Sequence, residues 1–177
     1  MKNKMKTIAK LFIAICSLFM PVFTFAQQEP QRPKIARNTI VYTSADNKII
    51  KPHNADAFNA KIVSNTYQNG QGVIIFDKEI TSIGNKAFSR CQSMTSVTIP
   101  DGVTSIGYSA FYNCRSLKSV YCKPTTPPTA GNNIFWYYEN GSWLIRCKIY
   151  VPTASVSAYK NASGWDTYAS NIVGYNF

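Results

Sequence analysis

The sequence lacks the residue groups that most enzyme and metal sites need. Its 177 residues include one histidine, His53, and no Cys-x-x-Cys pair, so a zinc set is not available. None of its many serines and threonines lies in a nucleophile-elbow motif, and Asp46-Asn47 lacks the spacing of a calcium loop. We therefore expect no catalytic residues, no bound metal and no cofactor.

Acidic residues are also few, with 8 Asp and Glu against 19 Lys and Arg. Asp77, Glu79 and Asp101 follow strand-like segments, where acidic side chains are ordinary turn residues. The resulting net charge of +11 is not gathered into one basic run outside the N-terminal segment 1–10, so we expect no nucleic-acid partner. Moderate positive charge fits solubility or attraction to acidic polymers and surfaces.

The N-terminal segment 1–26 has the pattern of a secretory signal peptide. Lysines at positions 2, 4, 6 and 10 precede the apolar run 11–20, and Thr24-Phe25-Ala26 places small residues where cleavage would follow Ala26. The run is short for a membrane-spanning helix, and Ile15 stands before Cys16 where a lipoprotein signal needs a small residue. We expect a chain that is secreted, periplasmic or at the cell surface, without a transmembrane segment.

Removal of this segment takes away four lysines and no acid, so the net charge falls from +11 to +7. We expect residues 27–37, which are rich in Gln and Pro, to be a flexible lead segment. Four cysteines remain: Cys91, Cys114, Cys122 and Cys147. Cys91 and Cys114 stand at the same position of successive repeats, which favours a small buried slot in each repeat; disulfides, permitted in an oxidising compartment, are the open alternative.

Residues 73–152 repeat with a period of about 23 residues, which is typical of a solenoid. The segment from Ile80 to Ile99 aligns over the segment from Val103 to Cys122, so that Phe88 lies over Phe111. Strands at 73–76, 96–99 and 119–122 should stack in parallel, about 4.8 Å apart.

Each predicted strand alternates inward and outward residues. Inward positions are Ile74 and Phe76, Val97 and Ile99, and Val120 and Cys122. Between strands, Gly84 and Gly107 permit a bend where a Cβ atom would clash, and the Ala-Phe pairs at 87–88 and 110–111 predict a short helical turn that drives a ring into the core.

The segments that flank the repeats differ from them. Residues 38–72 predict an N-terminal hairpin cap, with one hairpin over 38–52 and a second over 61–76 that turns at Asn69-Gly70. Within this segment, Asp56-Ala57-Phe58 is similar to the Ala-Phe element of the repeats. Residues 153–177 predict a C-terminal cap, with Thr153 as N-cap of a helix over 154–162 and a final strand over 172–175.

The last repeat is longer than the others. Val120 and Ile149 are further apart in the chain than Val97 and Val120, and most of the surplus is the segment 136–143. This aromatic insertion, with Asn140-Gly141 as its turn, predicts a projecting hairpin.

The stretch from Val97 to Leu117 resembles the BspA-like class of leucine-rich repeat, in its Val-x-Ile-Pro, Val-Thr-Ser-Ile-Gly and Ala-Phe-x-x-Cys-x-x-Leu elements. The ending from Lys148 to Tyr175 is similar to the C-terminal region of short secreted members. The resemblance implies a β-rich α/β solenoid: a short leucine-rich repeat array with an N-terminal β-hairpin cap and a C-terminal helical cap. It also implies a secreted or surface protein that acts in adhesion or binding.

Exposed aromatic residues are the candidate binding residues. Tyr121 and Tyr150 take the same outward strand position and, with Lys148, predict a patch on the sheet. Trp136, Tyr138 and Trp143 predict a second patch on the insertion, unless their rings fold back onto the protein. The expected partner is a protein or glycan, host-derived ones included. The alternatives are a structural or self-associating module without a ligand and, with less support, a hydrolase.

Overall fold

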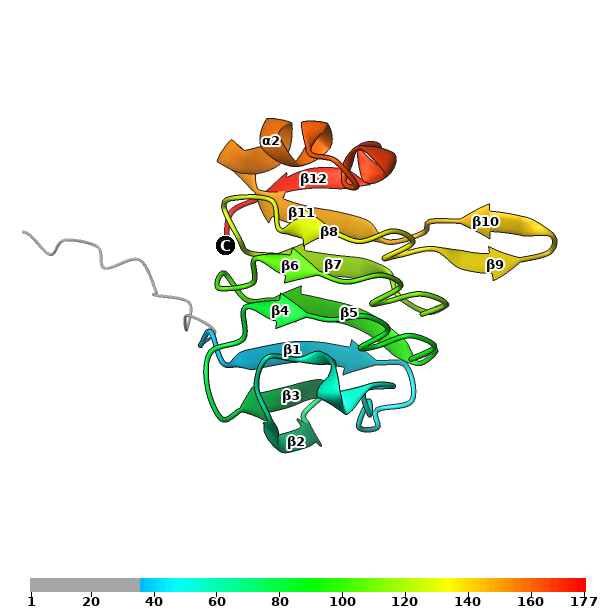
Figure 1. Ribbon diagram of the computed structural model, residues 1–177. Coiled ribbons are helices and arrows are strands. Elements are labelled where there is room, and N and C mark those ends of the chain that lie inside the picture. The colour runs from blue at the N-terminus through cyan, green and yellow to red at the C-terminus, as the bar shows by residue number, and fades with distance from the viewer. Residues whose placement is uncertain (1–35) are drawn as a thin grey trace, which may run out of the picture. The chain divides into compact units, whose positions relative to one another are not determined.

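The fold is organised by a seven-stranded mixed sheet in the order β12-β11-β7-β5-β1-β3-β2 (Figure 1). The computed structural model describes residues 36–177; the predicted signal peptide 1–26 and most of the lead segment lie outside the described residues. The strands of this sheet are β1 (Thr39–Ser44), β2 (Ile62–Gln68), β3 (Gln71–Phe76), β5 (Met94–Ile99), β7 (Ser119–Cys122), β11 (Lys148–Pro152) and β12 (Ile172–Tyr175).

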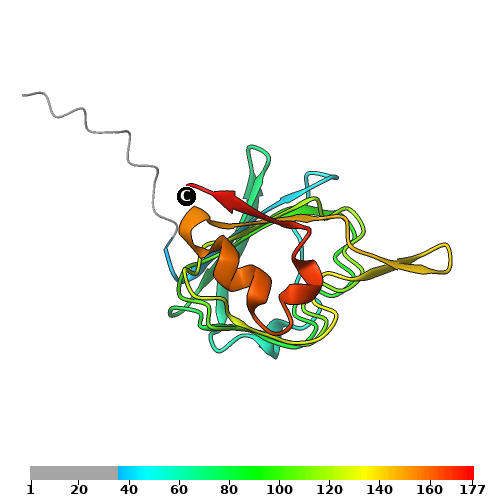
Figure 2. The ribbon, with the colours of Figure 1, turned by 90° about the horizontal axis from the view of Figure 1, so that it is seen from above.

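Shorter elements complete the described chain. A parallel three-stranded sheet joins β4 (Ser82–Ile83), β6 (Ser105–Ile106) and β8 (Thr129–Ala130), and an antiparallel pair joins β9 (Tyr137–Glu139) and β10 (Ser142–Leu144). The helical elements are the 3-10 helices η1 (Ala55–Ala57), η2 (Thr153–Ser155) and η3 (Asp166–Tyr168), and the α-helix α2 (Val156–Asn161). Seen down the stack, successive repeats nearly superpose, and the β9–β10 hairpin extends away from them (Figure 2).

The predicted parallel stacking is confirmed for the middle of the chain. Val97 of β5 pairs with Val120 of β7, which in turn pairs with Ile149 of β11. The register therefore keeps equivalent repeat positions side by side and absorbs the longer repeat in its loops. β12 continues the parallel ladder, because Ile149 pairs with Ile172, again one regular repeat length along the chain.

The predicted parallel contact between residues 73–76 and 96–99 is wrong. β1 lies between β3 and β5 and is antiparallel to both, so that Val41 pairs with Val73 on one side and with Thr98 on the other. The physical reason is the alternation within β1. Ile40 and Tyr42 are buried, and they fill the core position that the repeat period had predicted for the neighbouring repeat.

Of the two predicted hairpins, only the second is confirmed. β2 and β3 pair antiparallel, and Asn69 and Gly70 both take the positive φ that their turn requires. Residues 48–51, expected to return along β1, are not a strand. The Tyr42 hydroxyl instead accepts from the Ile50 amide at 3.0 Å, so a side chain replaces the strand partner.

A column of aromatic rings fills the core between the two sheets. Phe88 and Phe111 stack at 5.3 Å between ring centroids, and Phe111 and Phe135 stack at 5.6 Å. Phe58 extends the column, 5.6 Å from Phe88 and 4.9 Å from Phe76. The similarity of the segment around Phe58 to the repeats thus corresponds to a shared place in the core.

The expected helical turns at the Ala-Phe pairs are wrong, because the segments at 85–90 and 108–113 form turns that are not helical. Lys86, Arg90 and Ser109 have positive φ values, between 54° and 61°. This backbone directs alternate N–H groups at the next repeat: the Lys86 amide donates to the carbonyl of Tyr108 at 2.9 Å and the Arg90 amide to that of Tyr112 at 2.7 Å. The intervening amides bond within the turn, as Ala87 does to the Gly84 carbonyl at 3.3 Å, so hydrogen bonds between repeats replace only part of those of a helical turn.

The repeat glycines are required by the closeness of these turns. A Cβ atom on Gly107 would lie 2.6 Å from the Asn85 amide nitrogen, and one on Gly131 would lie 2.4 Å from that of Tyr108. The predicted clash is therefore with the backbone of the preceding repeat.

The C-terminal segment differs from prediction in its helix start. The helix α2 begins at Val156 after η2, and Thr153 donates its hydroxyl to Asn176 at 2.9 Å instead of capping the helix. The buried side chains of Tyr159 and Trp165 bond the Pro-rich segment, with Trp165 Nε1 donating to the Pro128 carbonyl at 2.7 Å. These bonds hold residues 153–177 against the last repeat.

Candidate functional site

Three tyrosines form a cluster on the outward face of the large sheet. The rings of Tyr121 and Tyr150 stack with centroids 4.9 Å apart and planes 14° apart. Tyr175 of β12 presents its edge to both, at 5.5 and 5.7 Å. Tyr121, Tyr150 and Tyr175 are called the tyrosine cluster below.

The strand register produces this cluster. Tyr121 and Tyr150 are paired residues of β7 and β11, between inward residues that are fully buried. Lys148 lies two positions before Tyr150, on the same face, and is exposed. The three predicted residues are thus brought to one face.

Two further aromatic residues near this patch, Tyr175 and Phe177, were not predicted from the sequence. Tyr175 pairs with Pro152 in the parallel ladder, and Phe177 lies 5.0 Å from Tyr175, with the Lys123 ammonium 5.6 Å from its ring. Pro152 and Tyr175 are one regular repeat length apart in the chain, and this spacing was the signal that could have revealed Tyr175. Together these residues give a packed aromatic surface edged by lysines, a chemistry suited to contacts with proteins.

The predicted patch on the aromatic insertion is divided by the structure. Tyr138 and Trp143 are 45% and 54% exposed, with ring centroids 4.9 Å apart, and Tyr112 lies 5.9 Å from Trp143. Trp136 is only half-exposed and packs against the core. Tyr138 and Trp143 therefore lie together, whereas Trp136 belongs partly to the core.

The base of the insertion is held by charge and packing. Arg146 forms an ion pair with Glu139, and its guanidinium lies 4.9 Å from the ring centre of the buried Tyr137. The confirmed hairpin turns at Asn140 and Gly141, which both have positive φ. The exposed rings thus stand on an anchored strand pair.

The cysteines have the properties of core residues. All four described cysteines are free, and Cys114, Cys122 and Cys147 are buried. Burial raises the pKa of Cys91 to about 11 and the pKa values of Cys122 and Cys147 to about 12, and it also raises that of Cys114. At neutral pH these thiols are protonated and are poor nucleophiles.

The acids of the turns have structural partners. Asp77 accepts from the Lys61 amide at 2.9 Å, and Arg37 contacts both Glu79 and Asp101. Within residues 36–177, no group of three or more His, Cys, Asp or Glu side chains could hold a metal ion. Over the same residues, no helix is long and apolar enough to cross a membrane.

Comparison with known proteins identifies one family. A family model of the BspA type leucine rich repeat region matches residues 60–161 in six copies, in agreement with the resemblance seen around Val97–Leu117. No curated protein matches the chain. Repeats of this type suggest a protein-interaction module, and leucine-rich repeat families are typically non-catalytic.

Proposed function

The chain belongs to the BspA-type leucine-rich repeat family, and on this premise we propose that it is an exported, non-catalytic module that binds a protein at or outside the cell surface. Its tyrosine cluster is the proposed contact surface, with Lys148 at its edge. The ladder of β5, β7 and β11 is a short solenoid in this account. β1 to β3 close one of its ends, and residues 153–177 close the other.

The observation that carries this proposal is the packing of Tyr121 against Tyr150. Two outward tyrosines held in parallel by paired strands lose little side-chain entropy when a partner covers them. Tyrosine is enriched among the residues that dominate binding energy at protein interfaces. A sheet face that served only solubility would not need such a stack.

A protein array tests the proposal. The purified protein is labelled and applied to extracellular-matrix and serum proteins, and each hit is measured again with the double variant Tyr121→Ala and Tyr150→Ala. We expect the double variant to weaken binding at least tenfold, because interface residues of this kind each contribute more than about 1 kcal/mol. An array without hits, or hits that the double variant binds unchanged, would contradict the proposal.

The matched control is the single variant Tyr138→Ala, measured beside the single variants Tyr121→Ala and Tyr150→Ala. Tyr138 is an exposed tyrosine of the β9–β10 hairpin, so the chemical change is the same. Binding that falls equally in all three single variants would indicate nonspecific binding through exposed aromatic residues rather than through the tyrosine cluster.

Export is tested by sequencing the N-terminus of the protein recovered from outside the cytoplasm. Cleavage after Ala26 predicts a chain that begins at Gln27. Recovery of the whole chain from the cytoplasm alone would remove export from the proposal.

A further inference from the structure

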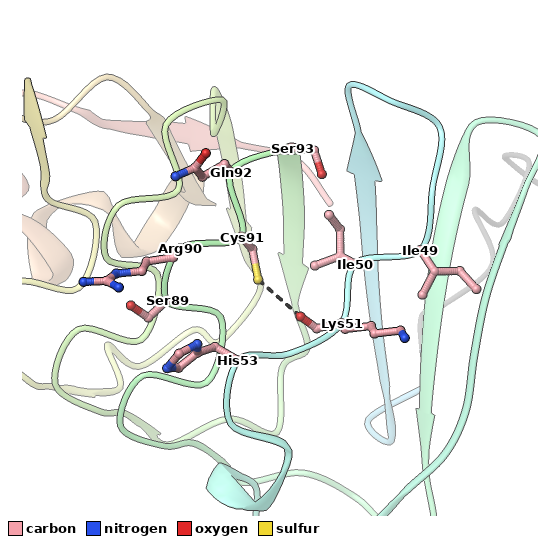
Figure 3. Close-up of a pocket in the computed structure, with 9 residues that line it drawn as sticks. All are labelled: Ile49, Ile50, Lys51, His53, Ser89, Arg90, Cys91, Gln92 and Ser93. Atoms are coloured by element: carbon pink, nitrogen blue, oxygen red, sulfur yellow. Dashed lines mark hydrogen bonds between the residues drawn. The ribbon is translucent and has the colours of Figure 1, made fainter.

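Two adjoining hollows form a groove beside the base of the β9–β10 hairpin, away from the tyrosine cluster. One, of about 480 Å³, is lined by His53, Lys86, Ser89, Arg90, Tyr108, Ser109, Tyr112, Asn133 and Trp143. The other, of about 270 Å³, is lined by Ile49, Ile50, Lys51, His53, Ser89, Arg90, Cys91, Gln92 and Ser93 (Figure 3). Because both include His53, Ser89 and Arg90, they form one continuous surface, called the basic groove below.

The charge of the basic groove has one sign. Lys51, Lys86 and Arg90 line it together with His53, and no Asp or Glu residue does. The ion pairs formed among residues 36–177 do not include Lys51, Lys86 or Arg90. Lys86 and Arg90 therefore line one hollow without a carboxylate of their own, whereas Lys51 lines only the smaller hollow and its side chain extends away from Arg90 (Figure 3).

The same groove carries exposed rings. Tyr108 is 46% exposed and Trp143 is 54% exposed, and Tyr112 lies beside Trp143. The exposed Asn133 and the buried Ser109, which is only 4% exposed, also line this hollow, and their side chains can donate and accept hydrogen bonds. Cations, rings and neutral polar groups thus line one surface.

The backbone under this surface has few free N–H groups that could bond the main chain of a peptide. The amides of Lys86 and Arg90 donate to the carbonyls of Tyr108 and Tyr112, so these N–H groups are already satisfied. The Ser109 amide likewise donates to Asn132 at 2.9 Å. A peptide that binds through its main chain would find few free partners at these positions, whereas rings, hydroxyls and cations match the parts of a charged sugar.

We propose that the basic groove binds an acidic polysaccharide, a chain of pyranose rings that carries carboxylate or sulfate groups. Trp143 and Tyr108 cover the apolar faces of the sugar rings, and Asn133 bonds their hydroxyl groups. Lys86 and Arg90 pair with the anionic groups along the chain. This site is separate from the protein-binding surface proposed above and does not depend on it.

Calorimetric titration of the purified protein tests this assignment. The probes are oligogalacturonate, its fully methyl-esterified neutral form, and a chondroitin sulfate oligosaccharide. We expect one or both acidic probes to bind, more weakly as salt rises, and the neutral form not to bind. The two acidic probes tell whether carboxylate or sulfate is preferred, and failure of both to bind would overturn the proposal.

Single-residue variants test whether the acidic probes bind in the basic groove or through the overall positive charge of the protein. Lys86→Gln and Arg90→Gln should each weaken binding about fivefold, as expected for the loss of one exposed ion pair. The control is Lys160→Gln on α2, which makes the same charge change away from the groove and should leave binding unchanged. Trp143→Ala should weaken binding about two- to tenfold through the lost ring. Equal losses with Lys160→Gln, no loss with Trp143→Ala, or equally tight binding of polyglutamate or single-stranded DNA would each overturn the sugar site.

The variant with Tyr121→Ala and Tyr150→Ala should bind the acidic oligosaccharide like the unaltered protein. This result keeps the two proposals independent, because either surface can fail its own test without affecting the other. Loss of sugar binding in that variant would place the ligand on the sheet and contradict the groove assignment.

Discussion

Truncation of Phe111 to alanine is expected to lower the free energy of unfolding by about 4–5 kcal/mol. Buried Phe-to-Ala changes cost about 3–5 kcal/mol, and a stacked ring pair adds about 0.5–1.5 kcal/mol beyond its area. Phe111 is 1% exposed and stacks on both Phe88 and Phe135, which places it at the upper end. The neighbours cannot readily close the cavity, because hydrogen bonds between repeats fix their backbone.

Urea unfolding followed by tryptophan fluorescence measures this loss. Trp165 is a suitable reporter, since it is fully buried and its ring lies 6.3 Å from that of Phe135. Phe111→Leu should cost about 1–2 kcal/mol because most of the volume is kept. Tyr108→Ala, which removes an exposed ring in the same repeat, should change the free energy by less than about 0.5 kcal/mol. An unchanged midpoint for Phe111→Ala would refute the aromatic column as the core.

Three further predictions concern other parts of the fold. Tyr42→Phe should cost about 1–2 kcal/mol in urea unfolding, because the Ile50 amide loses its acceptor; equal midpoints would show that water replaces the hydroxyl. Gly107→Ala should cost at least about 1–3 kcal/mol through its backbone clash, and a stable variant would show that the repeats can separate. Burial raises the pKa values of Cys122 and Cys147 to about 12, from an ordinary value of about 9. The free energy of unfolding should therefore fall between pH 9 and 12, because in this range only the unfolded chain loses these protons. A free energy of unfolding that stays constant from pH 8 to 10.5 would contradict this prediction.

Much of the fold could be predicted because equivalent residues recur at a fixed spacing and take equivalent places in the structure. The inward residues of β5 and β7, the stacked phenylalanines and the projecting hairpin all follow from spacing and alternation. The pairing of Tyr121 with Tyr150 follows from the same register. A single sequence is sufficient where each repeat makes its contacts with the next one along the chain.

The wrong predictions concern segments whose contacts are not with the next repeat along the chain, or whose backbone conformation depends on that repeat. β1 inserts between β3 and β5, and nothing local in Thr39–Ser44 encodes a partner as distant in the chain as β5. The non-helical turns depend on positive φ at Lys86 and Arg90, residues that do not usually favour it, and the hydrogen bonds that stabilise them come from the next repeat. The basic groove was missed for a related reason, because its residues come from five separate places in the chain: 49–53, 86–93, 108–112, 133 and 143.

Fluorine NMR of the fluorotyrosine-labelled protein tests the central claim most directly. Its resonances are assigned with single Tyr→Phe variants, and the protein is titrated with a partner found on the array. Binding at the sheet predicts that the signals of Tyr121, Tyr150 and Tyr175 shift, while those of the exposed Tyr108 and Tyr138 stay in place. Shifts confined to Tyr108 and Tyr138, with the tyrosine cluster unchanged, would contradict the account.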